Sequence, residues 1–299
     1  MKKLDKITLN PVDGFPYENS HYLHYGDYDI HYTVDEAQGE EKAKMFLIHG
    51  FMCNTSFFDE VTPLFTAAGI KCVRIDLPDF GYTTREMPDI NYIPRTELVC
   101  NVMRDLDTDN TGWIVLGHSM GGGVALDVSL AAPEMVNAIL LNCPFFLPNV
   151  PDILGKLVMI QPMRTMMNVV LDYAFAYDWV EALVIAMMTV SKGYTQSYSH
   201  GVMGHPFAVE NTGDGLCYMT AKSKGMNMDA LSSLPMPVQL ITGKMDAFVM
   251  PTNVVKLKKF LPDSLESVSY TTGGHCLIQD KADRVATDNL AFLKKKGLI

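Results

Sequence analysis

The feature that most constrains the fold is a regular alternation of short apolar runs with longer stretches of helical period. The apolar runs show no strict alternation with polar residues, which is typical of strands covered on both faces in a parallel sheet. The expected strands are residues 44–49, 71–76, 113–118, 136–142, 238–242 and 267–271, and the expected helices are residues 56–68, 94–106, 121–132, 251–261 and 281–296. This order predicts an α/β fold with a doubly wound, mostly parallel sheet.

Two segments depart from this alternation. Residues 24–32 alternate aromatic or apolar with polar side chains around a Gly-Asp turn, which predicts an antiparallel hairpin ahead of the parallel strands. Residues 145–232 contain no strand pattern, and methionine and aromatic residues recur there at helical spacing. We therefore expect a core made of residues 1–144 and 233–299, with residues 145–232 inserted as a helical cap.

The strongest local motif is Gly117-His118-Ser119-Met120-Gly121, which follows an expected buried strand and opens an expected helix. In this context G-x-S-x-G forms a nucleophile elbow, a turn so tight that small residues are needed on both sides of the serine. The N-terminus of the following helix directs free N–H groups and a positive dipole end at negative charge that forms beside the serine. We therefore predict that Ser119 is a nucleophile.

A serine nucleophile needs a base, and that base needs an acid to orient it. His275 follows the expected last strand, and Asp246 follows the strand before it. Both residues are therefore expected at the carboxyl edge of the sheet, where catalytic groups collect. The chain offers no carboxylate directly after the expected strand 136–142. We predict a triad of Ser119, Asp246 and His275, with Asp214 in the insertion as the alternative acid.

With these residues the chain resembles the α/β-hydrolase superfamily, in the group that carries a helical cap between the sixth and seventh core strands. The resemblance covers about residues 44–142 and 234–296. Residues 49–51, His-Gly-Phe, are similar to the oxyanion loop of that family. Residues 76–83 are similar to its D-x-P-G-x-G-x-S turn, with Asp79 where the first glycine is usual.

The resemblance implies which groups face the substrate. The backbone N–H groups of Phe51 and Met120 are expected to form the oxyanion hole. The substrate-binding residues are expected to be Phe51, Met52, Met120 and Phe145. Methionine side chains are flexible and polarizable, so the many methionines of the insertion suit an adaptable apolar binding surface.

Composition limits the partners and cofactors. The chain has 24 Lys and Arg against 34 Asp and Glu, and its net charge of −10 argues against nucleic acid and anionic membranes as partners. The six cysteines form no CxxC pair and no zinc-type spacing with histidine, so we expect buried, reduced thiols, no metal and no cofactor. No apolar stretch suits a signal peptide or a membrane span, which favours a cytoplasmic protein. The oligomeric state stays open.

These observations favour a serine hydrolase that cleaves small carboxylic esters of an apolar acyl or aromatic group through an acyl-enzyme. Two alternatives stay open. The same triad could act on a carbon–carbon, amide or lactone bond, or support perhydrolase or lyase chemistry, because the choice depends on pocket side chains that no motif fixes. The scaffold could also bind a ligand without catalysis, which an intact set of Ser, Asp and His disfavours.

Overall fold

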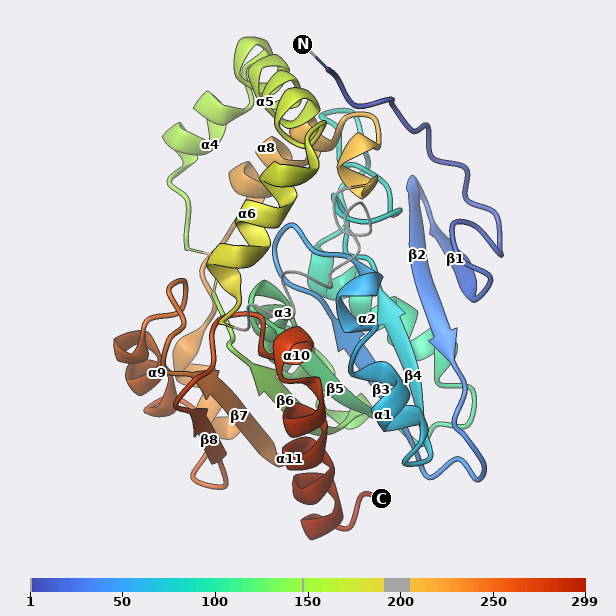
Figure 1. Ribbon diagram of the computed structural model, residues 1–299, viewed down its shortest axis with the longest axis vertical. Coiled ribbons are helices and arrows are strands. Elements are labelled where there is room, and N and C mark those ends of the chain that lie inside the picture. The colour runs from blue at the N-terminus through green and yellow to red at the C-terminus, as the bar shows by residue number, and fades with distance from the viewer. Residues whose placement is uncertain (1, 147, 191–204) are drawn as a thin grey trace.

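The computed structural model describes residues 2–146, 148–190 and 205–299. At the centre of these residues lies an eight-stranded sheet with the strand order β1-β2-β4-β3-β5-β6-β7-β8 (Figure 1). The parallel strands are β3 (Ala43–Ile48), β4 (Ile70–Ile75), β5 (Trp113–His118), β6 (Val136–Asn142), β7 (Val238–Gly243) and β8 (Glu266–Tyr270). The predicted α/β fold with a mostly parallel sheet is confirmed.

The predicted N-terminal hairpin is present and longer than expected. It consists of β1 (Ser20–Tyr25) and β2 (Tyr28–Asp35), which pair antiparallel through a turn at Gly26. Gly26 has φ +59°, a left-handed conformation that costs glycine little. β2 also runs antiparallel to β4, so the hairpin extends one edge of the parallel sheet.

Helices cover both faces of the sheet, as alternate residues of β3 illustrate. Phe46 and Ile48 belong to one hydrophobic cluster, whereas Met45 and Leu47 belong to another, because successive side chains of a strand point to opposite faces. The first cluster includes residues of α2 (Arg95–Leu106), α3 (Met120–Ala131) and α9 (Pro251–Lys258). The second includes residues of α1 (Thr62–Thr66), α10 (Leu277–Asp280) and α11 (Ala282–Lys295).

The predicted continuous helix over residues 56–68 is wrong. The chain instead forms a short 3-10 helix, Thr55–Phe58, and then α1, which begins at Thr62. Asn54 caps the first piece by accepting a hydrogen bond from the Ser56 N–H at 2.8 Å. Pro63 lies in the first turn of α1, where its missing N–H is harmless, but inside a continuous helix it would break the hydrogen-bond ladder.

The segment between β6 and β7 is helical in its described parts, as predicted. It contains α4 (Asp152–Val158), α5 (Gln161–Ala174), α6 (Asp178–Met188) and α8 (Thr212–Lys222), which group together beyond one end of the sheet (Figure 1). The carbonyl of Met188, the last residue of α6, accepts hydrogen bonds from the N–H groups of His275 and Cys276. The boundaries of a separate cap, residues 145–232, stay a prediction. Across the described residues, no helix combines the length and apolarity needed to cross a bilayer.

Candidate active site

Ser119 lies in the sharp turn between β5 and α3. Its φ of +51° is a strained value for a residue with a side chain, so the surrounding structure must enforce it. Gly117 and Gly121 permit this turn because neither has a side chain. A Cβ on Gly117 would lie 2.4 Å from the Gly121 carbonyl oxygen, and a Cβ on Gly121 would lie 2.1 Å from the Ile48 carbonyl oxygen. The geometry of a nucleophile elbow therefore follows from backbone packing that excludes side chains at these positions.

His275 lies in the loop between β8 and α10 and faces Ser119. Its Nε2 atom is 2.9 Å from Ser119 Oγ, and its Nδ1 atom is 2.8 Å from Asp246 Oδ2. An ionised carboxylate only accepts hydrogen bonds, so Nδ1 carries a proton and donates a hydrogen bond to Asp246. In a neutral ring, Nε2 is then the acceptor for the Ser119 hydroxyl. The predicted base is therefore in the tautomer that can receive the serine proton.

Asp246 is held in place by backbone groups of its own loop. Its second oxygen, Oδ1, accepts hydrogen bonds from the N–H groups of Phe248 and Val249, both at 2.8 Å. Burial alone would raise the pKa of Asp246, but the hydrogen bond and charge of His275, together with these N–H groups, lower it below the ordinary value. The alternative acid, Asp214, lies elsewhere: its carboxylate pairs with Arg164 at 2.6 Å.

The loop after β3 packs directly against the serine. A Cβ on Gly50 would lie 3.0 Å from the Cβ of Ser119. His49 fixes the peptide between Gly50 and Phe51: its Nε2 accepts the Leu77 N–H at 3.0 Å, so Nδ1 carries the proton and donates to the Gly50 carbonyl at 2.7 Å. Because a trans peptide is planar, holding this carbonyl also sets the opposite direction of the Phe51 N–H.

Met120 supplies the other predicted oxyanion donor as the first residue of α3. The first N–H groups of a helix have no partner within the helix, and their dipoles favour a negative charge. Within the described residues, no backbone acceptor receives the N–H of either Phe51 or Met120. Among the acceptors that the structure describes, both groups are therefore left available to donate. The Met120 side chain is buried in the core, so this residue offers the site its backbone.

His118 occupies the position between Gly117 and Ser119 without competing as a base. Its ring stacks on Phe57 with centroids 4.5 Å apart and lies 4.9 Å from the His275 ring. Burial, and then the proximity of His275, lower the pKa of His118 well below its ordinary value. His118 therefore stays neutral and packs against the His275 ring.

Three partly exposed phenylalanines lie next to these residues, and one of them, Phe145, donates its N–H to the Ser119 carbonyl at 2.8 Å. Phe51 is 41% exposed, Phe145 37% and Phe248 45%. The ring of Phe248 lies 5.3 Å from that of His275, and Phe51 contacts Phe80 edge to face. Met52, also predicted to bind substrate, is half-buried in the same loop as Phe51. Exposed aromatic rings in such a position favour contact with an apolar ligand.

Comparison with known proteins assigns the family. Residues 39–282 match the family described as Serine aminopeptidase, S33 (Hydrolase_4). The chain belongs to this family of α/β hydrolases. It is an α/β-fold serine hydrolase, as the sequence predicted.

The chain is also similar to a curated hydrolase and, in fold, to solved structures. The chain is 24% identical over 98% of its length to all of the "Uncharacterized hydrolase YugF" of Bacillus subtilis (strain 168). Its fold is similar to that of an esterase from Thermogutta terrifontis, with a TM-score of 0.68 and 15% identity over 89% of this chain and 94% of the other. It is also similar to the meta-cleavage product hydrolase of Pseudomonas fluorescens IP01, with a TM-score of 0.69 and 14% identity over 93% and 99%.

A second set of Ser, His and Asp lies inside this hydrolase, which the sequence analysis did not find. His31 Nδ1 is 2.7 Å from Asp76 Oδ2, and His31 Nε2 is 2.8 Å from Ser20 Oγ. All three side chains are 0% exposed. No substrate can reach this hydroxyl, so the set is structural. No local motif marks it, because Ser20 and His31 lie within the strands of the hairpin.

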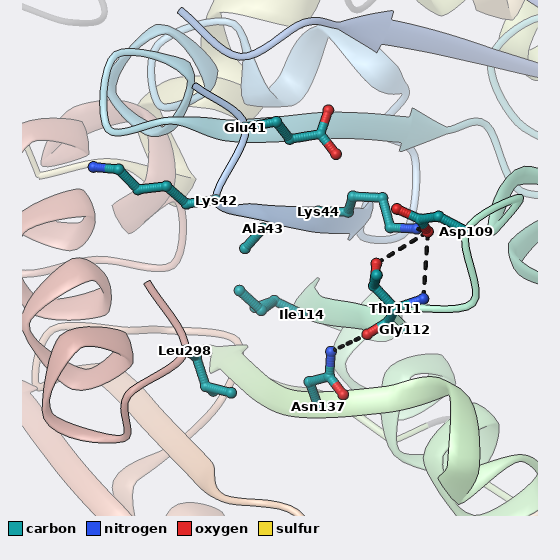
Figure 2. A pocket seen from close by; sticks show the side chains of 10 residues that line it. All are labelled: Glu41, Lys42, Ala43, Lys44, Asp109, Thr111, Gly112, Ile114, Asn137 and Leu298. Carbon is teal, nitrogen blue, oxygen red and sulfur yellow. Dashed lines mark hydrogen bonds and ion pairs between the residues drawn. The ribbon is translucent and has the colours of Figure 1, made fainter. Parts of the chain in front are cut away.

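A hollow at the opposite edge of the sheet does not join the candidate site. It lies at the beginnings of β3, β5 and β6 and near Leu298 (Figure 2). Its most buried charge, Lys44, pairs with Asp107 and Asp109. A lysine compensated by two carboxylates is a structural ion pair, so Lys44 is not available as a reactive group.

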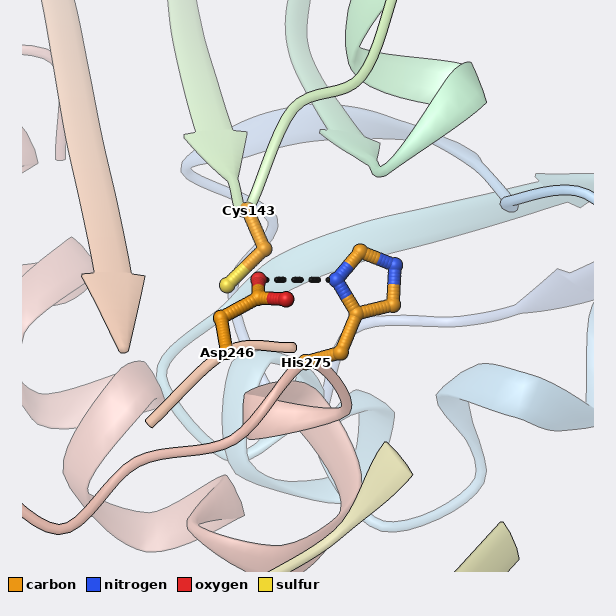
Figure 3. Close-up of side chains that lie close together, drawn as sticks. All are labelled: Cys143, Asp246 and His275. Atoms are coloured by element: carbon orange, nitrogen blue, oxygen red, sulfur yellow. Dashed lines mark hydrogen bonds and ion pairs between the residues drawn. The ribbon is translucent and has the colours of Figure 1, made fainter. Parts of the chain in front are cut away.

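One group of side chains in the described part of the hydrolase could hold a metal ion. Cys143, at the end of β6, lies beside Asp246 and His275, and one donor atom from each lies within 4.8 Å of the others (Figure 3). All six cysteines of the chain are buried and free of disulfides, as predicted. The spacing rules for zinc sites could not find this cluster, because its members are more than 25 residues apart in the sequence.

Proposed function

We propose that this hydrolase is a carboxylesterase in which Ser119 attacks the carbonyl carbon of an ester. His275 takes the proton of the serine hydroxyl and later delivers it to the leaving alkoxide. Asp246 holds the ring tautomer and stabilises the imidazolium. The N–H groups of Phe51 and Met120 bind the oxyanion of the tetrahedral intermediate, a role in which one donor typically contributes ~10²–10³ in rate. Water then releases the acyl group through the same base.

The observation that carries the proposal is the continuous hydrogen-bonded path from Ser119 through His275 to Asp246. Its two distances, 2.9 Å and 2.8 Å, are within the range that proton transfer needs. The serine is strained at φ +51° and stands at the N-terminus of α3, where a negative charge is favoured. A strained serine with a base and two free N–H groups beside it fits acyl transfer.

The substrate class that fits best is a small ester with an apolar acyl or aromatic group. Support comes from the exposed rings of Phe51, Phe145 and Phe248 around the three polar residues. The Thermogutta terrifontis neighbour, which shares the fold, is described as an esterase. A polar or charged acyl group would have to give up hydration against these rings without a compensating partner.

A second candidate is hydrolysis of another acyl bond by the same residues. The family is described as serine aminopeptidase, and one neighbour of the same fold is a meta-cleavage product hydrolase. Amide and carbon–carbon substrates need the same nucleophile and oxyanion donors but a leaving group that is harder to expel. We rank this candidate second because the exposed apolar rings at the site favour the small apolar ester of the first candidate.

The test is a turnover screen with p-nitrophenyl esters of increasing acyl length, aryl amides, lactones and β-diketones. We expect ester hydrolysis that Ser119→Ala abolishes together with covalent labelling by a fluorophosphonate. Ser20→Ala is the matched control, since it removes the hydroxyl of the other Ser, His and Asp set and should leave labelling intact. Labelling that survives in Ser119→Ala would move the nucleophile elsewhere, and turnover of amides or diketones without esters would favour the second candidate.

A further inference from the structure

Cys143, Asp246 and His275 bring three different donor atoms to one buried position. Each lies in the segment that follows one of the neighbouring parallel strands β6, β7 and β8, at the carboxyl end of the sheet (Figure 3). The Cys143 backbone has φ +45° and donates its N–H to the Ile241 carbonyl at 2.9 Å, which holds the main chain in place. The thiol itself donates to the Gly274 carbonyl at 3.8 Å, which directs the sulfur toward the His275 loop. The proposed acyl-transfer mechanism has no use for this sulfur.

We infer that Cys143, Asp246 and His275 form an inhibitory site for Zn²⁺ or a similarly soft divalent cation. Thiolate, imidazole and carboxylate are the three ligand types that zinc uses in proteins. A cysteine sulfur in the set disfavours Mg²⁺ and Ca²⁺, which prefer oxygen ligands. One thiolate and one carboxylate also cancel the two positive charges of the ion, which matters at a site where all three side chains are buried.

The spacing of the donor atoms suits such an ion after a small adjustment. Nitrogen, oxygen and sulfur ligands about 2.0–2.3 Å from one tetrahedral zinc lie roughly 3.3–3.6 Å from each other. In this structure the three donor atoms lie within 4.8 Å of one another, and His275 Nδ1 lies 2.8 Å from Asp246 Oδ2. That pair must open by about half an ångström, and the sulfur must approach by no more than about 1.5 Å.

A cation bound at this position would inactivate His275 as a base without contacting Ser119. The ion takes the Nδ1 lone pair, so the ring proton moves from Nδ1 to Nε2. Nε2 then donates to Ser119 Oγ and can no longer accept the serine proton. The Cys143 thiol releases its proton to solvent as the metal–sulfur bond forms, and nothing is oxidised or reduced. The result is a reversible, metal-dependent loss of turnover.

The experiment measures hydrolysis of a p-nitrophenyl ester after preincubation with ZnCl₂, followed by EDTA. Wild type is compared with Cys143→Ala and with Cys100→Ala, which removes another buried thiol, on α2 and outside the cluster. Each protein is scaled to its own metal-free rate. We expect wild type and Cys100→Ala to be inhibited and EDTA to restore them. Cys143→Ala should need at least about 30-fold more zinc, since even outer-shell partners are worth about 10–100-fold in metal affinity.

A second measurement detects binding without turnover. Titration with Cd²⁺ should produce the ultraviolet absorption of a cadmium–thiolate bond in wild type and Cys100→Ala but not in Cys143→Ala. Binding is independent of the proposed function, whereas inhibition rests on it, so the two can fail separately. Equal zinc sensitivity of Cys143→Ala and wild type, or no cadmium–thiolate absorption in wild type, would overturn the inference. Full activity of wild type in zinc while the absorption is present would overturn the inhibitory role.

Discussion

Replacing His31 removes a link from a buried network that ties the N-terminal hairpin to the loops beside the candidate site. His31 contacts Asp76 through Nδ1 and Ser20 through Nε2. The Asp76 carboxylate also accepts the N–H groups of Thr55, at 2.6 Å, and Tyr82, at 2.8 Å. One carboxylate therefore joins β2 to the segments that follow β3 and β4, and its contact with His31 has a measurable contribution to stability.

The two contacts of His31 can be removed separately. The amide of Asn lies near the position of Nδ1, so His31→Asn keeps the donor to Asp76 and loses the contact with Ser20, costing about 0.5–1.5 kcal/mol. The amide of Gln reaches toward the position of Nε2, so His31→Gln loses a hydrogen bond to a charged group, costing about 1.5–3 kcal/mol. His24→Gln is the control: this histidine also pairs with an aspartate, but it is 63% exposed and its loss should cost at most about 0.5–1 kcal/mol.

The assay is urea unfolding followed by tryptophan fluorescence. Of the two tryptophans, Trp179 is already 65% exposed and Trp113 is buried in the sheet, so the change on unfolding comes mainly from Trp113. With equal m values, the midpoints should fall in the order wild type, His24→Gln, His31→Asn and His31→Gln. The calculation would be refuted if His31→Gln were no less stable than His24→Gln. A His31→Asn variant less stable than His31→Gln would assign the larger contribution to Ser20 and refute the role of Asp76.

Three further predictions concern Asp246, the turn that holds Ser119, and the dependence of stability on pH. Asp246→Asn should lower kcat for esters by about 10⁴ with little change in KM, because the wrong tautomer of the base is favoured; a loss below tenfold in steady-state kinetics would contradict this role. Gly121→Ala should unfold or severely destabilise the chain, since its Cβ would lie 2.1 Å from the Ile48 carbonyl oxygen, whereas Gly225→Ala meets only ordinary contacts and should melt like wild type. Burial raises the pKa of Asp76, but the neighbouring histidines lower it by more, so the pKa lies below its ordinary value. The contribution of Asp76 to stability is therefore complete above the ordinary aspartate pKa of about 3.9 and is lost as the pH falls through the lowered value. The gap in urea midpoint between wild type and Asp76→Asn should therefore shrink as the pH falls below about 3.9, and a gap that widens there would reverse the assigned sign.

The fold was predictable where one local pattern decides it. β5 and β6 begin and end at the predicted residues, because strands covered on both faces have continuous apolar sequences. The helix predicted over residues 56–68 failed because its apolar period continues through a break that Asn54 and Pro63 impose. Helical period reports which side chains face the core, and two short helices in line can satisfy it as well as one long helix.

The positions of the candidate site residues were predictable for two different reasons. Ser119 has a local signal, the motif between a strand and a helix. His275 and Asp246 were placed by topology, since parallel strands deliver the residues that follow them to one edge. Cys143 is delivered to the same edge, but the sequence gives no rule for which neighbours a thiol there will contact. Which neighbours the Cys143 thiol contacts depends on the loop of Asp246 and on the end of α6, through contacts between residues distant in sequence.

Two sets of the same three residue types allow the features that make a serine reactive to be separated. Ser20 and Ser119 both lie about the same distance from a histidine that contacts an aspartate. Ser20, however, is fully buried and its Oγ already accepts the Tyr17 N–H at 3.1 Å. Ser119 is 7% exposed, its backbone is strained, and it begins a helix whose N–H groups have no helical partners. Access and free donors, more than the histidine contact, therefore distinguish the two hydroxyls, and a fluorophosphonate should label Ser119 and leave Ser20 unmodified.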